Sequence, residues 1–82
     1  MAASRQTIEK WFKAGVEQWA THLIVVCDTY DWTDYPVYVS QGQDPKGIKL
    51  HYNRAAMQRV MEVYNLNMDM EIQLNQYRSF NY

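Results

Sequence analysis

The sequence predicts one α+β domain in which helices pack on a short sheet, in the order α-β-β-(β)-α-α. Three observations support this class: an amphipathic stretch near the N-terminus, a buried apolar run at residues 23–27 and a second β-prone run at residues 36–40. With 82 residues and a hydrophobic share of 48%, the chain suits a single small core and is too apolar to be disordered. The whole chain, residues 1–82, is therefore expected to form one domain.

The amphipathic stretch predicts a helix that begins after Ser4, whose hydroxyl suits an N-cap. Its apolar residues recur at the three- and four-residue spacing of one helix face, and Gly15 on that face lets another segment approach closely. The aromatic residues are expected in the core. The stripe consists of Ile8, Trp11, Phe12, Gly15, Val16 and Trp19.

The run Leu-Ile-Val-Val-Cys at residues 23–27 is the predicted central strand. It is too short for a helix, is rich in β-branched residues and is bounded by polar residues, which is typical of a strand buried on both faces. Burial is expected to keep the thiol of Cys27 protonated and inert. Because Pro36 lacks an N–H group, residues 36–40 are predicted to start a strand there or to lie at a sheet edge.

The second half of the chain is compatible with more than one arrangement. A turn-rich linker at residues 41–47 precedes a weakly alternating segment, residues 48–52, that suits a short third strand. Asn53 is expected to cap a second helix over residues 54–64. The apolar face of that helix would contain Met57, Val60, Met61 and Tyr64.

The last segment, residues 66–77, has an ambiguous pattern. Apolar residues alternate from residue 66 to residue 74, which indicates a strand. Their types are helix formers, and Asn67 or Asp69 suits an N-cap, so a third helix is favoured.

Charge is distributed unevenly along the chain. No Lys or Arg occurs between Lys13 and Lys46, and residues 14–45 carry five acids, a net charge of −5. The remaining residues carry eight bases and four acids, a net charge of +4, so the total is −1. This asymmetry favours self-association or a basic partner, and the chain lacks the global basic field that would attract nucleic acid. One cysteine and no apolar run of membrane-spanning length predict a cytoplasmic protein without membrane contact.

The candidate functional stretch is residues 28–35, which alternate carboxylates with aromatic side chains. A connection of eight residues is long for a hairpin and is more often functional than a tight turn. Tyrosine and tryptophan dominate recognition surfaces and stack on bases or arginine, while arginine near a helix N-terminus pairs with phosphate. The predicted binding residues are Asp28, Tyr30, Asp31, Trp32, Asp34, Tyr35, Tyr38, Tyr52, Arg54 and Arg59.

These residues predict a non-enzymatic binding protein whose ligand is a protein or a small molecule of nucleotide type. The aspartates lack the spacing and glycine of a calcium loop, one Cys and two distant His give no zinc pattern, and no glycine-rich phosphate loop occurs. We therefore predict no catalytic residue, metal or cofactor. Two alternatives stay open: a small metal-dependent hydrolase or transferase that uses Asp28, Asp31 and Asp34, and a purely structural oligomerising protein.

Three segments of the chain resemble a group of small bacteriophage and prophage proteins that have no assigned activity. The segments are THLIVVCDTYDWTDYPVYV at residues 21–39, NRAAMQRVMEVYNL at residues 53–66 and QLNQYRSFNY at residues 73–82. The resemblance implies a context and transfers no site residue. Small phage proteins are frequently inhibitors of host defence that bind a host protein or sequester a nucleotide-type signal.

A homodimer is also expected. A domain this small has more large apolar side chains than its own core absorbs, and such surplus surface usually marks an interface. The predicted contributors at the C-terminus are Tyr77, Phe80 and Tyr82.

Overall fold

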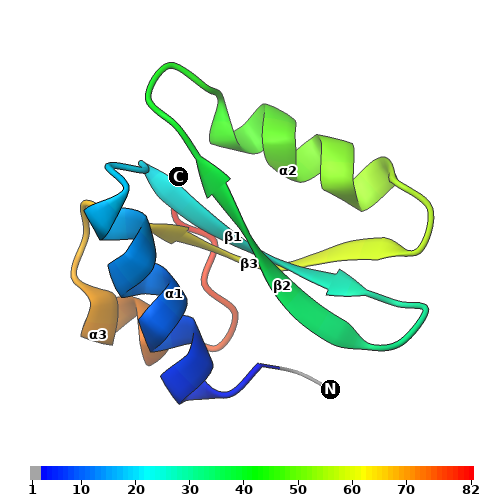
Figure 1. Cartoon of the computed structure of the whole chain (residues 1–82), viewed down its shortest axis with the longest axis horizontal. Coiled ribbons are helices and arrows are strands. Elements are labelled where there is room, and N and C mark those ends of the chain that lie inside the picture. Colours follow the sequence, from blue (N-terminus) through cyan, green and yellow to red (C-terminus); the bar gives the residue numbers. More distant parts are fainter. Residues whose placement is uncertain (1–2) are drawn as a thin grey trace.

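The computed structural model describes residues 3–82 as three helices and one three-stranded sheet (Figure 1). The elements are α1 (Arg5–Glu17), β1 (His22–Asp28), β2 (Thr33–Val39), α2 (Pro45–Arg54), β3 (Gln58–Asn65) and α3 (Met70–Leu74). The predicted α+β class is confirmed, whereas the observed order, α-β-β-α-β-α, differs from the prediction in the second half. Among the described residues, no helix has the length and apolar character needed to cross a membrane.

β1 is the middle strand of the sheet, as predicted. The strand order is β2-β1-β3, and both neighbours run antiparallel to β1. Its apolar residues, Leu23, Ile24, Val25, Val26 and Cys27, are each at most 5% exposed. Because successive side chains of a strand point to opposite faces, this burial requires that both faces of the sheet be covered.

Helices cover both faces (Figure 1). On one face, α1 and α3 pack over a cluster that includes Phe12, Leu23, Val25 and Tyr64. On the other face, α2 and the C-terminal segment pack over a cluster formed by Ile24, Val26, Val39, Val60 and Val63. The sheet is therefore the middle of three layers.

α1 begins where the sequence predicts, and Gly15 lies where the side chains of Leu66 and of Tyr38 on β2 approach it closely. The Ser4 hydroxyl accepts a hydrogen bond from the backbone N–H of Thr7. A Cβ atom at Gly15 would lie 2.8 Å from Cε1 of Tyr38. The Tyr38 hydroxyl donates to the carbonyl oxygen of Trp11 at 2.8 Å, which fixes the ring against the helix.

Trp19 is not a core residue, which corrects the prediction. α1 ends at Glu17, and Trp19 has a φ of 61° and a side chain that is 82% exposed. The N–H of Trp19 donates to the carbonyl of Val16 and that of Ala20 to the carbonyl of Gly15, the bond pair of a Schellman motif. Glycine usually occupies the left-handed position of this motif, because a side chain strains it.

The predicted strand at residues 48–52 lies instead within α2. Asp44 caps this helix, since its carboxylate accepts a backbone hydrogen bond from Lys46 at 3.1 Å. Pro45 is favourable at the first helical position, where its missing N–H costs nothing. The N-terminal signal for this helix was therefore in the segment interpreted as a linker.

The predicted helix at residues 54–64 is mostly β3, and a β-bulge explains the error. Val25 pairs with Glu62, whereas the next residue, Val26, pairs with Val60, so Met61 is an extra residue in β3. The bulge gives each face of the sheet a pair of residues three apart, Met61 and Tyr64 on the α1 side and Val60 and Val63 on the α2 side, so the predicted helix face is divided between the two faces. A spacing that is typical of a helix face thus comes from a bulged strand.

α3 is shorter than the predicted helix, and the alternative strand at residues 66–74 is wrong. Asp69 caps it, because its Oδ1 atom accepts the N–H of Ile72 at 3.0 Å. The alternating apolar residues therefore enter a turn and one short helix.

Groups from outside the sheet bind the backbone along the outer edge of β3. The side chain of Asn53 accepts the N–H of Val60 at 2.8 Å. The N–H of Val63 donates to the carbonyl of Ser79 at 2.8 Å, and its carbonyl accepts the N–H of Asn81 at 3.0 Å. The C-terminal segment thus follows this part of β3 as a parallel neighbour.

Gln73 of α3 completes this edge at the end of β3. Its side chain is fully buried and pairs with both backbone groups of Asn65, accepting from the N–H and donating to the carbonyl at 2.8 Å each. The same amide also bonds the carbonyls of Met68 and Asp69 and the side chain of Asn81. A buried polar side chain for which no role was predicted therefore joins three segments.

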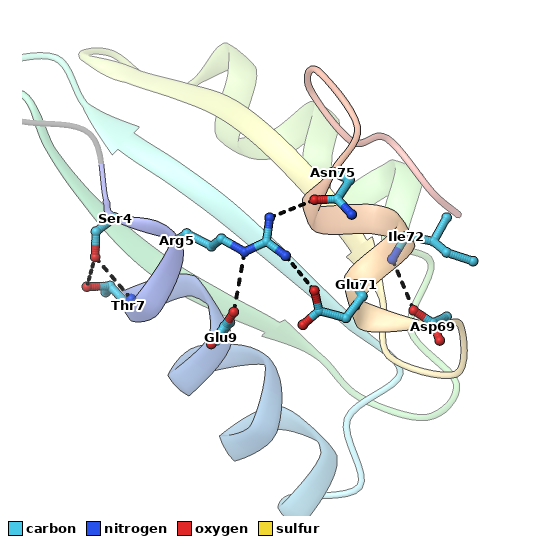
Figure 2. A network of polar contacts seen from close by, with 8 residues as sticks. All are labelled: Ser4, Arg5, Thr7, Glu9, Asp69, Glu71, Ile72 and Asn75. Atoms are coloured by element: carbon cyan, nitrogen blue, oxygen red, sulfur yellow. Dashed lines mark hydrogen bonds and ion pairs between the residues drawn. The ribbon is translucent and has the colours of Figure 1, made fainter.

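Arg5 links α1 to α3 across the surface (Figure 2). Its guanidinium donates to Oε2 of Glu71 at 2.6 Å and to Oδ1 of Asn75 at 2.8 Å, and more weakly to Glu9 on its own helix at 3.4 Å. The side chains of Arg5 and Glu71 are 45% and 60% exposed, so this ion pair contributes at most about 1 kcal/mol. Its main effect is to orient the short helix.

We expect Gly15→Ala to lower the free energy of unfolding by about 1–2 kcal/mol. The new methyl group would overlap a ring that its own hydrogen bond holds in place, and this outweighs the gain in helix propensity. Gly47→Ala in α2 is the matched control, because its Cβ would meet only Asp44 at 3.4 Å or more. Urea unfolding should show opposite signs for the two variants, and equal signs would contradict the packing argument.

At position 19 we expect glycine to be more stable than alanine by about 1 kcal/mol, because only glycine adopts the positive φ without strain. Trp19→Gly and Trp19→Ala remove the same exposed ring, so their difference isolates the backbone. Thermal unfolding measures it. A higher midpoint for Trp19→Ala would show that the left-handed conformation is not retained.

We expect Gln73→Met, which keeps the volume but removes the amide, to cost about 2–4 kcal/mol. The change leaves both backbone groups of Asn65 buried without their partner. Gln6→Met, at an exposed position of α1, is the control and should be neutral. Hydrogen exchange at the Asn65 amide should accelerate in Gln73→Met alone; unchanged protection would refute this role for Gln73.

Candidate functional site

The candidate site is the tip of the β1–β2 hairpin, residues 29–32. The predicted loop of eight residues is shorter in the structure, because Asp28 pairs with Thr33, Cys27 with Asp34, and the ladder continues from there. Only four residues remain unpaired between the strands. The prediction of a long loop is therefore wrong, and the carboxylates and rings are held by a hairpin.

Hydrogen bonds to aspartates shape this tip. The carboxylate of Asp28 accepts the N–H of Tyr30 at 2.9 Å, and its carbonyl accepts the N–H of Trp32 at 2.7 Å. Asp31 accepts the hydroxyl and the N–H of Thr33 at 2.6 and 3.1 Å. These are Asx-type contacts that set the course of the turn. They also lower the pKa of Asp31, chiefly through the Thr33 hydroxyl, so this carboxylate stays ionised at neutral pH.

Large apolar side chains are exposed around the tip. Tyr30 is 77% and Trp32 60% exposed. Met57, in the turn before β3, is 53% exposed, and its carbonyl accepts the N–H of Thr29 at 2.9 Å, which holds the two turns together. We call the exposed side chains Tyr30, Trp32 and Met57 the tip surface.

Two members of the tip surface have an unusual backbone. Trp32 and Met57 both have a φ of 60°. Non-glycine residues rarely adopt this conformation, which costs about 1 kcal/mol or more. Strain of this kind is concentrated at functional sites, and here it coincides with exposure of the two side chains.

The three predicted aspartates do not converge. Asp28 and Asp31 bind backbone groups of the turn, while Asp34 accepts the backbone N–H of Ala3 at 2.8 Å. Within residues 3–82, no group of three or more His, Cys, Asp or Glu side chains is arranged to hold a metal ion. The alternative of a metal-dependent hydrolase thus lacks a ligand set in the described part of the chain.

The remaining predicted tyrosines pack within the fold. Tyr35 and Tyr52 lie edge to face on the α2 side of the sheet, with ring centroids 6.5 Å apart, and the Tyr35 hydroxyl donates to Gln58. Tyr38 packs on the opposite side, against α1. Burial raises the pKa of Tyr35 and Tyr38. Because these tyrosine rings pack on two sides of the sheet, they do not form the predicted site in which a nucleotide base would stack between tyrosines.

The two predicted arginines flank the turn between α2 and β3. Arg54 is the last residue of α2 and Arg59 the second residue of β3, and both are exposed. Neither lies at a helix N-terminus, so the expected phosphate-binding arrangement is absent from the described structure. Arg59 is opposite Cys27 in the sheet, and burial, with a contribution from Asp34, raises the pKa of that thiol. Cys27 is therefore protonated, as expected.

Sequence reasoning missed Met57 and Trp19 as exposed residues. Both occur in apparent apolar stripes of helices, and this spacing concealed that each lies in a turn. Asn53, which precedes the turn at Met57, suited the N-cap of a helix, so the turn was not predicted.

Comparison with known proteins adds no relative from which a site can be inferred. No protein-family model matches the chain, and no match was found among curated proteins or solved structures. The resemblance to small phage proteins therefore stays a prediction, and the geometry of the hairpin tip is the basis for assigning a function.

Proposed function

We propose that the chain is a non-enzymatic binding protein that docks on another protein through the tip surface. The observation that carries this proposal is the exposure of Tyr30 and Trp32 on a hairpin whose turn is fixed by hydrogen bonds. Tyrosine and tryptophan supply most of the affinity in protein interfaces, because they bury a large area and lose few rotamers.

The rigidity of the tip favours recognition. Hydrogen bonds accepted by Asp28 and Asp31 set the course of the tip, and β1, from which the tip extends, is buried from Leu23 to Cys27. A site that is already ordered loses less conformational entropy on binding. The backbone strain at Trp32 supports the same conclusion, since a glycine there would be more stable in the free protein.

Charges around the tip define the partner. Asp31 is exposed and ionised, and Arg54 and Arg59 lie on the other side of Met57. The partner should therefore have an apolar depression for the rings, with a basic group facing Asp31. In line with the phage resemblance, we propose a host protein of the cytoplasm, a compartment that also suits the free thiol of Cys27.

The test compares the same change, tryptophan to glycine, at two positions. Trp32→Gly removes a ring of the tip surface and relieves the positive φ, so we expect a protein at least as stable as wild type that binds its partner about 30-fold more weakly. Trp19→Gly is the matched control, because it also removes an exposed tryptophan at a φ near 60°, before the start of β1.

The measurement is capture from a bacterial host lysate by each immobilised protein, followed by mass spectrometry and titration of the captured protein. Proteins retained by wild type and Trp19→Gly but lost by Trp32→Gly support the proposal. The same proteins at equal affinity on all three baits would rule out the tip surface.

A further inference from the structure

Residues of α2 and the C-terminal residue Tyr82 form a second surface, which we call the lysine–tyrosine pocket. The pocket has a volume of about 340 Å³ and is lined by Lys46, Lys49, Leu50, Asn53 and Tyr82. Leu50 is 49% and Tyr82 39% exposed, so the pocket has an apolar floor. This volume is at the lower end of the range for small-ligand sites and suits one or two large side chains.

The pocket is positively charged. Nζ of Lys46 lies 5.3 Å and Nζ of Lys49 5.8 Å from the centre of the Tyr82 ring. Lys49 and Arg78 both lie over the ring of Phe80, at 4.9 and 5.2 Å. Both ion pairs found within residues 3–82 involve Arg5, so neither lysine forms an ion pair with a described carboxylate; the nearby carboxylate of Asp44 binds the backbone N–H of Lys46 instead.

These properties define the chemistry of an occupant. It should present a carboxylate to the two ammonium groups and a flat apolar group to Leu50 and Tyr82. The hairpin tip of this chain has both, because the exposed carboxylate of Asp31 stands between the exposed rings of Tyr30 and Trp32.

The tip of the same molecule does not reach its own pocket. Thr29 is bonded to Met57, which holds the tip beside the C-terminal end of α2. Of the pocket residues, only Asn53 lies in the last turn of α2, whereas both lysines and Tyr82, which they contact, lie toward the first turn of α2 and the C-terminus. In Figure 1 the first turn of α2 is at the other end of the helix from the hairpin tip. A tip that fills this pocket therefore has to come from another molecule.

We propose that the hairpin tip of one copy docks in the lysine–tyrosine pocket of a second copy, and that two such reciprocal contacts form a closed homodimer. A two-fold axis makes each contact occur twice, which adds their free energies without leaving a free tip or pocket. The inference rests on the proposed function in one respect: the same tip surface makes the contact, so the dimer and the host protein compete for the tip. It assigns a role in this dimer to Tyr82, whereas Phe80 belongs to the core and Tyr77, 94% exposed, lies outside the contact.

A charge-reversal experiment with light scattering tests the dimer. Wild type at millimolar concentration should have twice the 9.8 kDa mass of the chain. Asp31→Lys places a cation opposite the lysines and Lys49→Glu an anion opposite Asp31, so each variant alone should dimerise at least about tenfold more weakly. An equimolar mixture of the two variants should restore the dimer. In the mixed dimer, the lysine at position 31 of one variant faces the glutamate at position 49 of the other. The second contact pairs the native tip of the Lys49→Glu variant with the native pocket of the Asp31→Lys variant.

Controls separate this contact from general charge effects and from misfolding. Glu17→Lys and Lys10→Glu reverse exposed charges on α1. Each of these variants alone, and an equimolar mixture of the two, should dimerise as strongly as wild type. Asp31→Asn keeps an oxygen acceptor for Thr33, so it preserves the turn if Asp31→Lys unfolds, and it should also weaken the dimer.

A wild type of monomer mass, or a dimer that neither reversal weakens, would overturn the proposal. A monomer that still captures a host protein through Trp32 would overturn it and leave the proposed function intact. A monomer whose capture of that protein depends on Lys49 would likewise overturn it and assign the pocket to another protein. A dimer restored by mixing, together with no capture dependent on Trp32, would support the dimer and refute the proposed function.

Discussion

The fold depends on burying β1 on both faces. A strand with five consecutive apolar residues has no solvent-facing side, so helices must cover the sheet above and below. In 82 residues, this leaves three short helices, of which α2 contains no buried residue. Two further features are consistent with this shortage of covering chain: the close approach at Gly15 and the large exposed side chains at the hairpin tip.

The sequence was sufficient to predict β1 and α1, because each has a pattern that only one structure explains. Five β-branched or apolar residues between polar neighbours are too short for a helix, and the stripe after Ser4 has the helical period. It was insufficient for β3. There the bulge at Met61 shifts the side-chain alternation by one residue, and periodicity cannot distinguish a bulged strand from a helix.

The candidate site was predicted in part for the same kind of reason. Tyr30, Asp31 and Trp32 lie at an exposed turn, as expected, since polar and aromatic residues directly after a buried strand have to leave the core. Tyr35 also lies among acidic and aromatic residues in the sequence, as Tyr30 and Trp32 do. It nevertheless belongs to the sheet, because strand pairing between β1 and β2 includes Asp34 and Tyr35. How far a hairpin ladder extends depends on contacts between strands, which composition does not encode.

The two outer strands of the sheet disfavour pairing with a further strand by different means. At β3, Asn53, Gln73 and the C-terminal segment occupy backbone groups that an incoming strand would need. At β2, Pro36 lies in the middle of the strand and has no N–H to offer. Polymerisation through the backbone, the usual hazard of a small open sheet, is thereby suppressed. Contacts of this chain with other molecules are then left to exposed side chains, which mutation can change one at a time.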